Sequence, residues 1–156
     1  MIPALVFSGM SVGGYVEFIK QYLDIFVFGL LGMMSFVMVW FVIERYIFFA
    51  RIALSDYEHA DTLNITLTAH LTTIASIGAN APYIGLLGTV MGILITFYDL
   101  GQGGDIEPAT IMLGLALALK ATAMGLVVAI PAILFYNALL RKVDVLTERW
   151  KRMQGL

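Results

Sequence analysis

The sequence contains no cysteine and only two histidines, His59 and His70. Without cysteine the chain can form neither a disulfide framework nor a thiolate metal site. The two histidines are too far apart in a polar segment to be typical of a metal-binding pair, and we interpret them as solvated side chains. The sequence therefore predicts no metal site and no cofactor.

Charge is also scarce. Charged residues make up 13% of the chain and hydrophobic residues 60%, and the mean hydropathy is +0.91. Soluble domains are close to half apolar and a quarter charged, so this composition excludes an ordinary soluble domain. The net charge of -2 is too small to favour nucleic acid as a partner.

Three long stretches are almost free of charge. Ile25 to Ile43 and Leu71 to Tyr98 have none, and Ala109 to Leu140 contains only Lys120. Each reaches the ~20 residues that a helix needs to cross a ~30 Å hydrocarbon core. We therefore predict an all-α integral membrane protein with three transmembrane helices in a single domain, 1–156. Its expected segments are an amphipathic start (1–22), the first span (23–49), a short connection (50–70), the second span (71–98), a loop (99–109), the third span (110–140) and a tail (141–156).

The start, 1–22, has two interpretations. It can form an amphipathic helix on the membrane surface, or it can be the first turns of helix one.

The distribution of basic residues predicts the orientation. Arg45 and Arg51 follow the first span, five Lys and Arg residues lie in the tail, and 99–109 has none. Because basic loops stay on the cytoplasmic side, the N-terminus and 99–109 are expected outside, and 50–70 and the tail inside. The third helix is longer than a span needs. Pro131 predicts a kink in it rather than an end, and the amphipathic tail is expected to extend it into the cytoplasm.

Small residues recur at spacings of three and four in the second and third spans. Hydrophobicity does not join helices inside a bilayer, but small residues allow their backbones to approach closely. The two faces are expected to pack against each other or against a neighbouring copy. The residues assigned to this packing are Gly85, Gly88, Gly92, Gly114 and Gly125, with Pro82 and Pro131 in the same helices.

Four polar side chains lie inside the spans. Thr89 and Thr96 are on the second helix, and Thr122 and Lys120 on the third. A threonine in a membrane often bonds back to its own helix, and the alternative is a polar lining for water or an ion. A lysine at mid-span costs ~2.5 to 3.5 kcal/mol, so it either snorkels or faces a wet interior. No span contains a central Asp or Glu, so a proton pathway here would need a carboxylate from a partner chain.

Two motifs carry a resemblance. "APYIGLLGTVMGI" (81–93) and "ALKATAMGLVVAIPAILFYN" (118–137) resemble the two signature helices of the ExbB/TolQ/MotA proton-channel family, most closely its ExbB members in a short form. With "ERYIFFAR" after the first span, the resemblance covers Tyr22 to Arg141.

The resemblance implies a homopentamer in the bacterial inner membrane, with the N-terminus periplasmic. Its pore is expected to hold an ExbD-like single-span partner that carries an aspartate. Proton flow would then drive a TonB-like protein that energises outer-membrane transport, and the chain would not be an enzyme. The family's pore threonines correspond to Thr89 and Thr122. Leu117 stands where the resemblance implies a glutamate, with Lys120 one turn further on.

Two alternatives remain open. One is a TolQ-like subunit of a Tol-Pal envelope-integrity system, whose motifs are the same. The other is a helical scaffold that conducts nothing and uses its glycine faces for packing alone.

Overall fold

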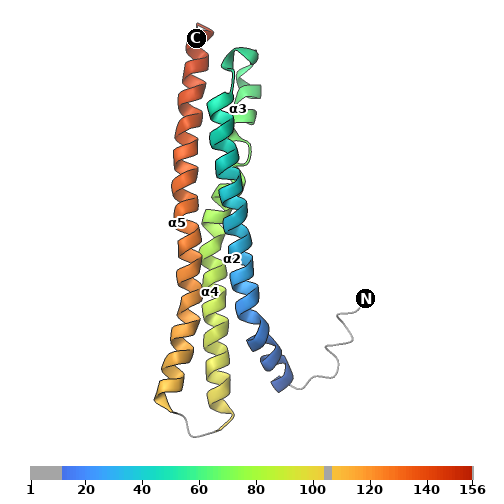
Figure 1. The fold of residues 1–156 in the computed structure, drawn as a ribbon, viewed down its shortest axis with the longest axis vertical. Coiled ribbons are helices and arrows are strands. Elements are labelled where there is room, and N and C mark those ends of the chain that lie inside the picture. The colour runs from blue at the N-terminus through green and yellow to red at the C-terminus, as the bar shows by residue number, and fades with distance from the viewer. Residues whose placement is uncertain (1–11, 104–106, 156) are drawn as a thin grey trace, which may run out of the picture. The chain divides into compact units, whose positions relative to one another are not determined.

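The computed structural model describes residues 12–103 and 107–155. Within these ranges the chain is helical and has no strand. The elements are α2 (Val12–Arg51), η1 (Leu54–Asp56), α3 (Ala60–Thr68), α4 (Leu71–Gly101) and α5 (Pro108–Met153) (Figure 1). The predicted all-α fold with three long apolar helices is confirmed. Residues 1–11 of the predicted amphipathic start, and 104–106 of the predicted loop, lie outside the described residues.

Three stretches are long and apolar enough to cross a membrane: Tyr22–Arg51, Ala60–Gly101 and Pro108–Met153. α2 is continuous from Val12, with no break at the predicted start of the first span. α5 passes through Pro131 and ends at Met153. Its 46 residues extend ~69 Å at ~1.5 Å per residue, which exceeds a ~45 Å bilayer with its headgroups. The tail therefore continues helix three, as predicted.

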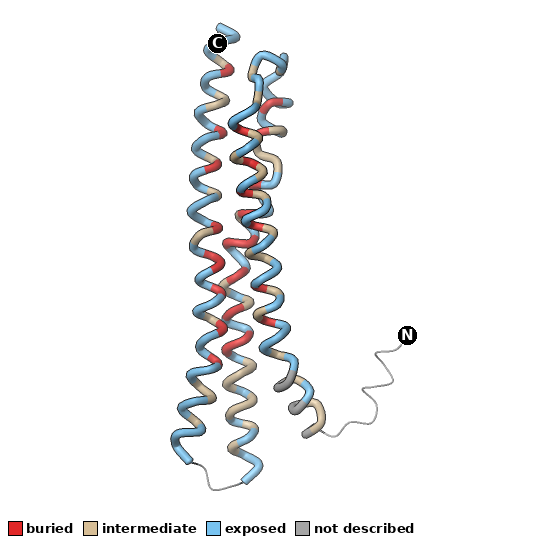
Figure 2. The backbone as a smooth tube through the Cα atoms, in the orientation of Figure 1, coloured by how far each residue is buried: buried red, intermediate tan, exposed pale blue. Residues whose placement is uncertain are grey.

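Contacts divide the chain into two units. Unit 1 combines the chain up to Leu31 with Tyr83–Gly125, and unit 2 combines Gly32–Pro82 with the chain from Leu126. In each unit, segments of α2, α4 and α5 pack together, and the buried residues of each helix form a stripe along it (Figure 2). The outward faces carry large apolar side chains such as Phe36, Trp40 and Leu134. These faces suit lipid rather than water.

Unit 2 also contains the connection between the first two spans. Leu63 and Leu67 of α3 are fully buried. The buried Arg45 pairs with Glu44, donates a 3.0 Å hydrogen bond to the carbonyl of Thr66, and lies 4.5 Å from the Phe48 ring centroid. Because a buried guanidinium must be paired, these contacts fix α3 beside the end of α2.

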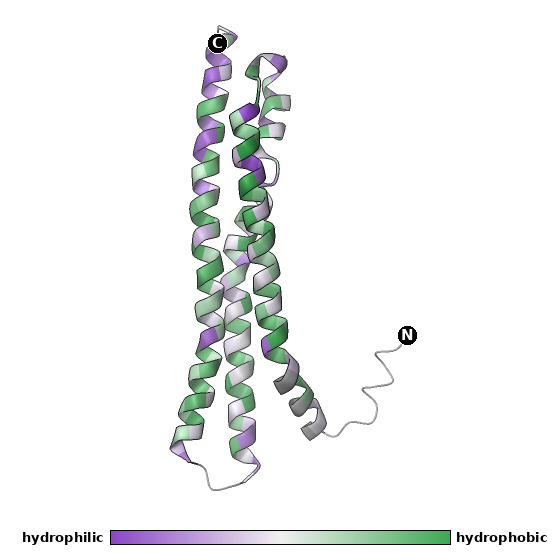
Figure 3. Cartoon of the chain, in the orientation of Figure 1, coloured by the Kyte–Doolittle hydropathy of each residue, from purple (hydrophilic) through white to green (hydrophobic). Residues whose placement is uncertain are grey.

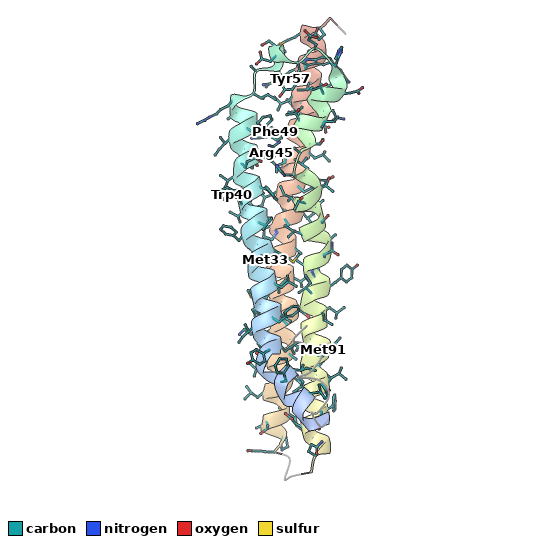
Figure 4. All side chains as sticks on the ribbon, turned by 90° about the vertical axis from the view of Figure 1, so that its right-hand side faces the viewer. Met33, Trp40, Arg45, Phe49, Tyr57 and Met91 are labelled. Atoms are coloured by element: carbon teal, nitrogen blue, oxygen red, sulfur yellow. The ribbon has the colours of Figure 1, made fainter. Side chains whose placement is uncertain are left out.

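Two further contacts in unit 2 involve the connection between the first two spans. The Trp150 indole N–H of α5 donates a 2.9 Å hydrogen bond to the carbonyl of Tyr57, which lies in the connection after η1. Figure 4 labels Arg45, Phe49 and Tyr57 in this region. His70 separates α3 from α4 with a left-handed φ of 63°, and its ring stacks on Phe41 with the centroids 4.4 Å apart. Because residues other than glycine rarely adopt this φ, the stacking of the His70 ring on Phe41 helps to hold the turn.

Candidate functional site

In unit 1, glycines of α4 bring its backbone against α5. A Cβ added at Gly85 would lie 2.7 Å from the carbonyl oxygen of Ala121, and one at Gly92 would lie 2.8 Å from the Ala118 Cβ. A Cβ on Gly88 would meet Ala121 at 2.8 Å and Val27 of α2 at 3.1 Å. The small faces of α4 and α5 therefore meet within one chain, at a distance that only glycine permits.

This close approach brings Thr89 and Thr122 together. Their hydroxyl oxygens are hydrogen-bonded to each other across the α4–α5 contact. Thr89 is 7% exposed, whereas Thr122 is half-buried. Thr89 Oγ1 also lies 3.2 Å from the carbonyl oxygen of Ala118 and 3.3 Å from that of Gly85. Thr122 Oγ1 lies 3.4 Å from the same Gly85 oxygen.

The hydroxyl pair has two complete hydrogen-bond arrangements. A hydroxyl donates one proton and can accept others. If Thr122 donates to Thr89, then Thr89 can donate to the Ala118 carbonyl. If Thr89 donates to Thr122, then Thr122 can donate to the Gly85 carbonyl. In the first arrangement the Thr122 hydroxyl can still accept a hydrogen bond at the half-buried end, and in the second it can turn its proton from the Gly85 carbonyl to an outside acceptor. The pair, which we call the threonine pair, can thus present either a donor or an acceptor there without a movement of the helices.

Thr96 is in a different environment. Its hydroxyl donates a 2.9 Å hydrogen bond to the carbonyl of Gly92, four residues earlier on its own helix. A Cβ on Gly114 of α5 would lie 2.8 Å from the same hydroxyl oxygen. Thr96 therefore bonds to its own helix and packs against the α5 backbone, and it is not part of the threonine pair.

A cavity of about 520 Å³ lies beside Thr96 within unit 1. At its loop end it is lined by the carboxylate residues Asp24, Asp99 and Glu107. Thr110, three residues after Glu107, also lines it. At its other end it reaches Gly88 and Ala121, which adjoin Thr89 and Thr122 in sequence. The cavity is large enough to hold several water molecules, and hydroxyl and carboxyl groups lie in its wall.

The three carboxylate residues were missed as site residues from the sequence. A signal is present for Asp99 and Glu107, because the loop 99–109 contains acidic residues and no basic residue. By itself that pattern predicts the orientation of the chain and not a shared site. Which acids would line a common cavity depends on how α2, α4 and α5 pack, and spacing along one helix does not give that.

Lys120 lies apart from the threonine pair. It is exposed on α5, and its ammonium nitrogen is 4.9 Å from the centroid of the Phe28 ring of α2. Leu117, one turn earlier, is also exposed. The contact with Phe28 is a cation–π interaction, which compensates part of the cost of a lysine in an apolar span.

Comparisons with known proteins give the family of the chain. Residues 50–152 match the MotA/TolQ/ExbB proton channel family. The biopolymer transport protein ExbB of Helicobacter pylori is 53% identical over 144 residues, which are 92% of this chain and 99% of that protein. The chain belongs to the MotA/TolQ/ExbB proton channel family. The predicted resemblance is therefore confirmed.

Two more relatives show how the likeness varies across the family. The biopolymer transport protein ExbB of Aquifex aeolicus is 46% identical over 140 residues, 90% of this chain and 95% of that protein. The Tol-Pal system protein TolQ of Pseudomonas aeruginosa is 39% identical over 100 residues, 64% of this chain and 41% of that protein. The two ExbB proteins match almost end to end, so neither is much longer or shorter than this chain.

Proposed function

We propose that this chain is an ExbB-type subunit of a homopentameric proton channel in the bacterial inner membrane. The channel uses the proton motive force to move a TonB-like protein and so energises outer-membrane transport. The observation that carries this proposal is the threonine pair, which is the polar feature at the centre of an uncharged, glycine-packed contact. Family membership and the likeness to ExbB relatives support the same reading.

The titrating group of the channel is supplied by a partner. A proton pathway needs a group that takes up and releases a proton, and a hydroxyl cannot do this at ordinary pH. The stretches 25–43, 71–98 and 109–140, which form most of the three spans, contain no Asp or Glu. We therefore infer an ExbD-like single-span partner with an intramembrane aspartate, which passes the half-buried end of the threonine pair.

The orientation gives the cavity its role. With the N-terminus and 99–109 in the periplasm and the tail in the cytoplasm, the acidic end of the cavity faces the side from which protons arrive. Carboxylates around its mouth raise the local concentration of cations. The cavity then provides a wet path toward the level of the threonine pair.

The energetics favour hydroxyls over charged side chains at the place where the partner's carboxylate passes. One proton that crosses ~100 mV provides ~2.3 kcal/mol. A fixed positive charge beside the partner's carboxylate would hold it too strongly for a step of that size. The threonine pair can donate to the ionised carboxylate or accept from the protonated one, so it offers a hydrogen bond to both states.

A TolQ-like subunit of a Tol-Pal system is the second candidate. The likeness to a TolQ protein over 100 residues supports it, and the threonine pair would act in the same way there. Uptake by a TonB-dependent receptor in a deletion strain that expresses this chain and its partner distinguishes the two. Restored uptake supports the ExbB-type function, and restored envelope integrity without uptake supports the TolQ type.

Native mass spectrometry tests the proposed assembly. The protein purified in mild detergent should appear as a pentamer, with or without the partner, and membrane lipids should remain bound to it. A stable monomer or dimer under gentle conditions would contradict the proposed assembly. Co-expression with the ExbD-like protein should add partner mass to the pentamer.

Replacement of Lys120 by methionine should preserve the fold and lower the affinity for the partner. Methionine keeps a sulfur–aromatic contact with Phe28 and removes the charge, so the packing is retained. Partner affinity is measured on the purified complex, with Leu119→Met on the neighbouring exposed position as the matched control. Equal affinity in Lys120→Met and the unmodified protein would show that the lysine faces lipid. A cysteine at position 120 should then react only with lipid-soluble reagents.

A further inference from the structure

A second cavity lies in unit 2, at the end of the spans where basic residues gather. It has a volume of about 350 Å³ and is formed by the last turns of α2 and the C-terminal part of α5. Its lining includes Tyr46 and Phe49 from α2, and Arg141, Lys142, Val145 and Arg149 from α5. Figure 3 shows hydrophilic residues gathered toward the C-terminal end of α5. We call this cavity the basic groove.

The cations of the basic groove form no ion pair among the described residues. Among the described residues, no carboxylate forms an ion pair with Arg141, Lys142 or Arg149, although Glu148 on the same helix does pair with Lys151 at 2.8 Å. Lys142 instead lies over the Tyr46 ring, with its nitrogen 4.1 Å from the centroid. None of the residues that line the groove is acidic. The lining of the groove therefore carries three positive charges and no carboxylate.

The groove lies just beyond the uncharged stretches of α2 and α5. Arg141 directly follows Leu140, the last residue of the uncharged stretch in α5, and Tyr46 lies just beyond the uncharged stretch in α2. Phe49 is 9% exposed and, with Val145, gives the groove an apolar wall. Aromatic residues at such a level anchor to the interface, and basic pockets between spans bind anionic headgroups.

We propose that the basic groove is a binding site for an anionic phospholipid. Arg141 and Arg149 hold the phosphate with charge-assisted hydrogen bonds, for which guanidinium groups are suited. Lys142 adds a point charge that the Tyr46 ring keeps in place. The apolar wall contacts the first part of an acyl chain. A soluble phosphate has no acyl chain and would leave this wall uncovered. The site depends on the membrane placement of α2 and α5 and is independent of proton conduction.

Lipid titration of the detergent-purified full chain tests the site. Phosphatidylglycerol is the probe, phosphatidylethanolamine is the zwitterionic comparison, and bound lipid is counted by native mass spectrometry. We expect selective binding of phosphatidylglycerol. Glycerol 3-phosphate serves as the free headgroup. Binding of glycerol 3-phosphate as tight as that of the lipid, or equal binding of the two lipids, would overturn the proposal.

A pair of charge-matched variants separates the groove from general surface charge. Arg141→Gln with Arg149→Gln should weaken phosphatidylglycerol binding on the order of a hundredfold, at about tenfold for each lost charged hydrogen-bond donor. Lys151→Gln with Arg152→Gln removes the same charge from the end of α5, outside the groove, and should weaken it about twofold or less, because screening limits distant charges. Equal losses in the two variants would overturn the proposal.

The basic groove could instead be covered by a second copy of the chain. In that case the variant with Arg141→Gln and Arg149→Gln would dissociate the oligomer while leaving lipid binding unchanged, and this result would also overturn the proposal. Tyr46→Leu is a milder variant, because it keeps the apolar volume and removes the ring beneath Lys142. It should weaken phosphatidylglycerol binding severalfold, at about 0.5–1 kcal/mol for an exposed cation–π contact, and leave the oligomer intact.

Discussion

Replacement of Thr89 or Thr122 by valine should abolish energised transport while the protein still assembles. Valine has nearly the shape of threonine, so the close contact of α4 and α5 is retained. Each single variant also leaves a partner for the remaining hydroxyl. Thr122 keeps the Gly85 carbonyl at 3.4 Å, and Thr89 keeps the Ala118 carbonyl at 3.2 Å. Thr122→Val removes the hydroxyl at the half-buried end, and Thr89→Val removes the donor that satisfies Thr122 while Thr122 donates to the partner.

Uptake through a TonB-dependent receptor and the pentamer mass are measured on the same preparations. Thr73→Val makes the same chemical change at an exposed position of α4 and should leave both unchanged. We expect each single variant of the threonine pair to lose uptake as completely as the double variant, because the pair acts as a unit. Normal uptake in the double variant would show that the hydroxyls serve packing alone.

Replacement of Gly85 by alanine should destabilise the protein, and leucine should prevent the α4–α5 contact. The added Cβ would lie 2.7 Å from a backbone oxygen of Ala121 and 3.0 Å from the Thr122 Cα. Backbone atoms of a packed helix cannot move aside as a flexible side chain can. Overpacking of this kind costs roughly 1–3 kcal/mol for small additions. It would also separate Thr89 from Thr122, so uptake should fall with stability.

Thermal denaturation of the protein in detergent measures this loss of stability. Gly29→Ala is the matched control, because a Cβ at Gly29 of α2 would have nothing within 4 Å. This control should be as stable as the unmodified protein or slightly more so, since alanine favours a helix over glycine. If Gly85→Ala were as stable as Gly29→Ala, then the contact described for Gly85 would be wrong.

Much of the fold could be predicted from the sequence because a bilayer restricts what an apolar chain can do. Charge-free stretches of span length must become helices, since no water is present to satisfy the backbone. The continuation of α5 through Pro131 could be predicted because the apolar pattern resumes after it. Whether the start formed a separate surface helix could not be decided, because both interpretations have the same residue pattern. α2 runs unbroken from Val12.

The candidate site was only partly predictable. Small residues at helical spacing indicate that two backbones approach, but not whether the second belongs to the same chain. The α4 and α5 faces meet within one chain, which places Thr89 in the interior of the subunit. The separation of Lys120 from the threonine pair and the acidic lining of the cavity both depend on the rotation of packed helices. A single helix's sequence does not determine that rotation.

Proton flux into sealed vesicles tests the central claim most directly, which is that this chain forms the channel and a partner supplies the titrating carboxylate. Vesicles contain either the chain alone, the chain with its ExbD-like partner, or the chain with a partner whose intramembrane Asp is replaced by Asn. A pH-sensitive dye reports internal acidification under an imposed potential. We predict flux only with the unmodified partner. Equal flux from the chain alone, or from the complex with the Asn partner, would contradict the account.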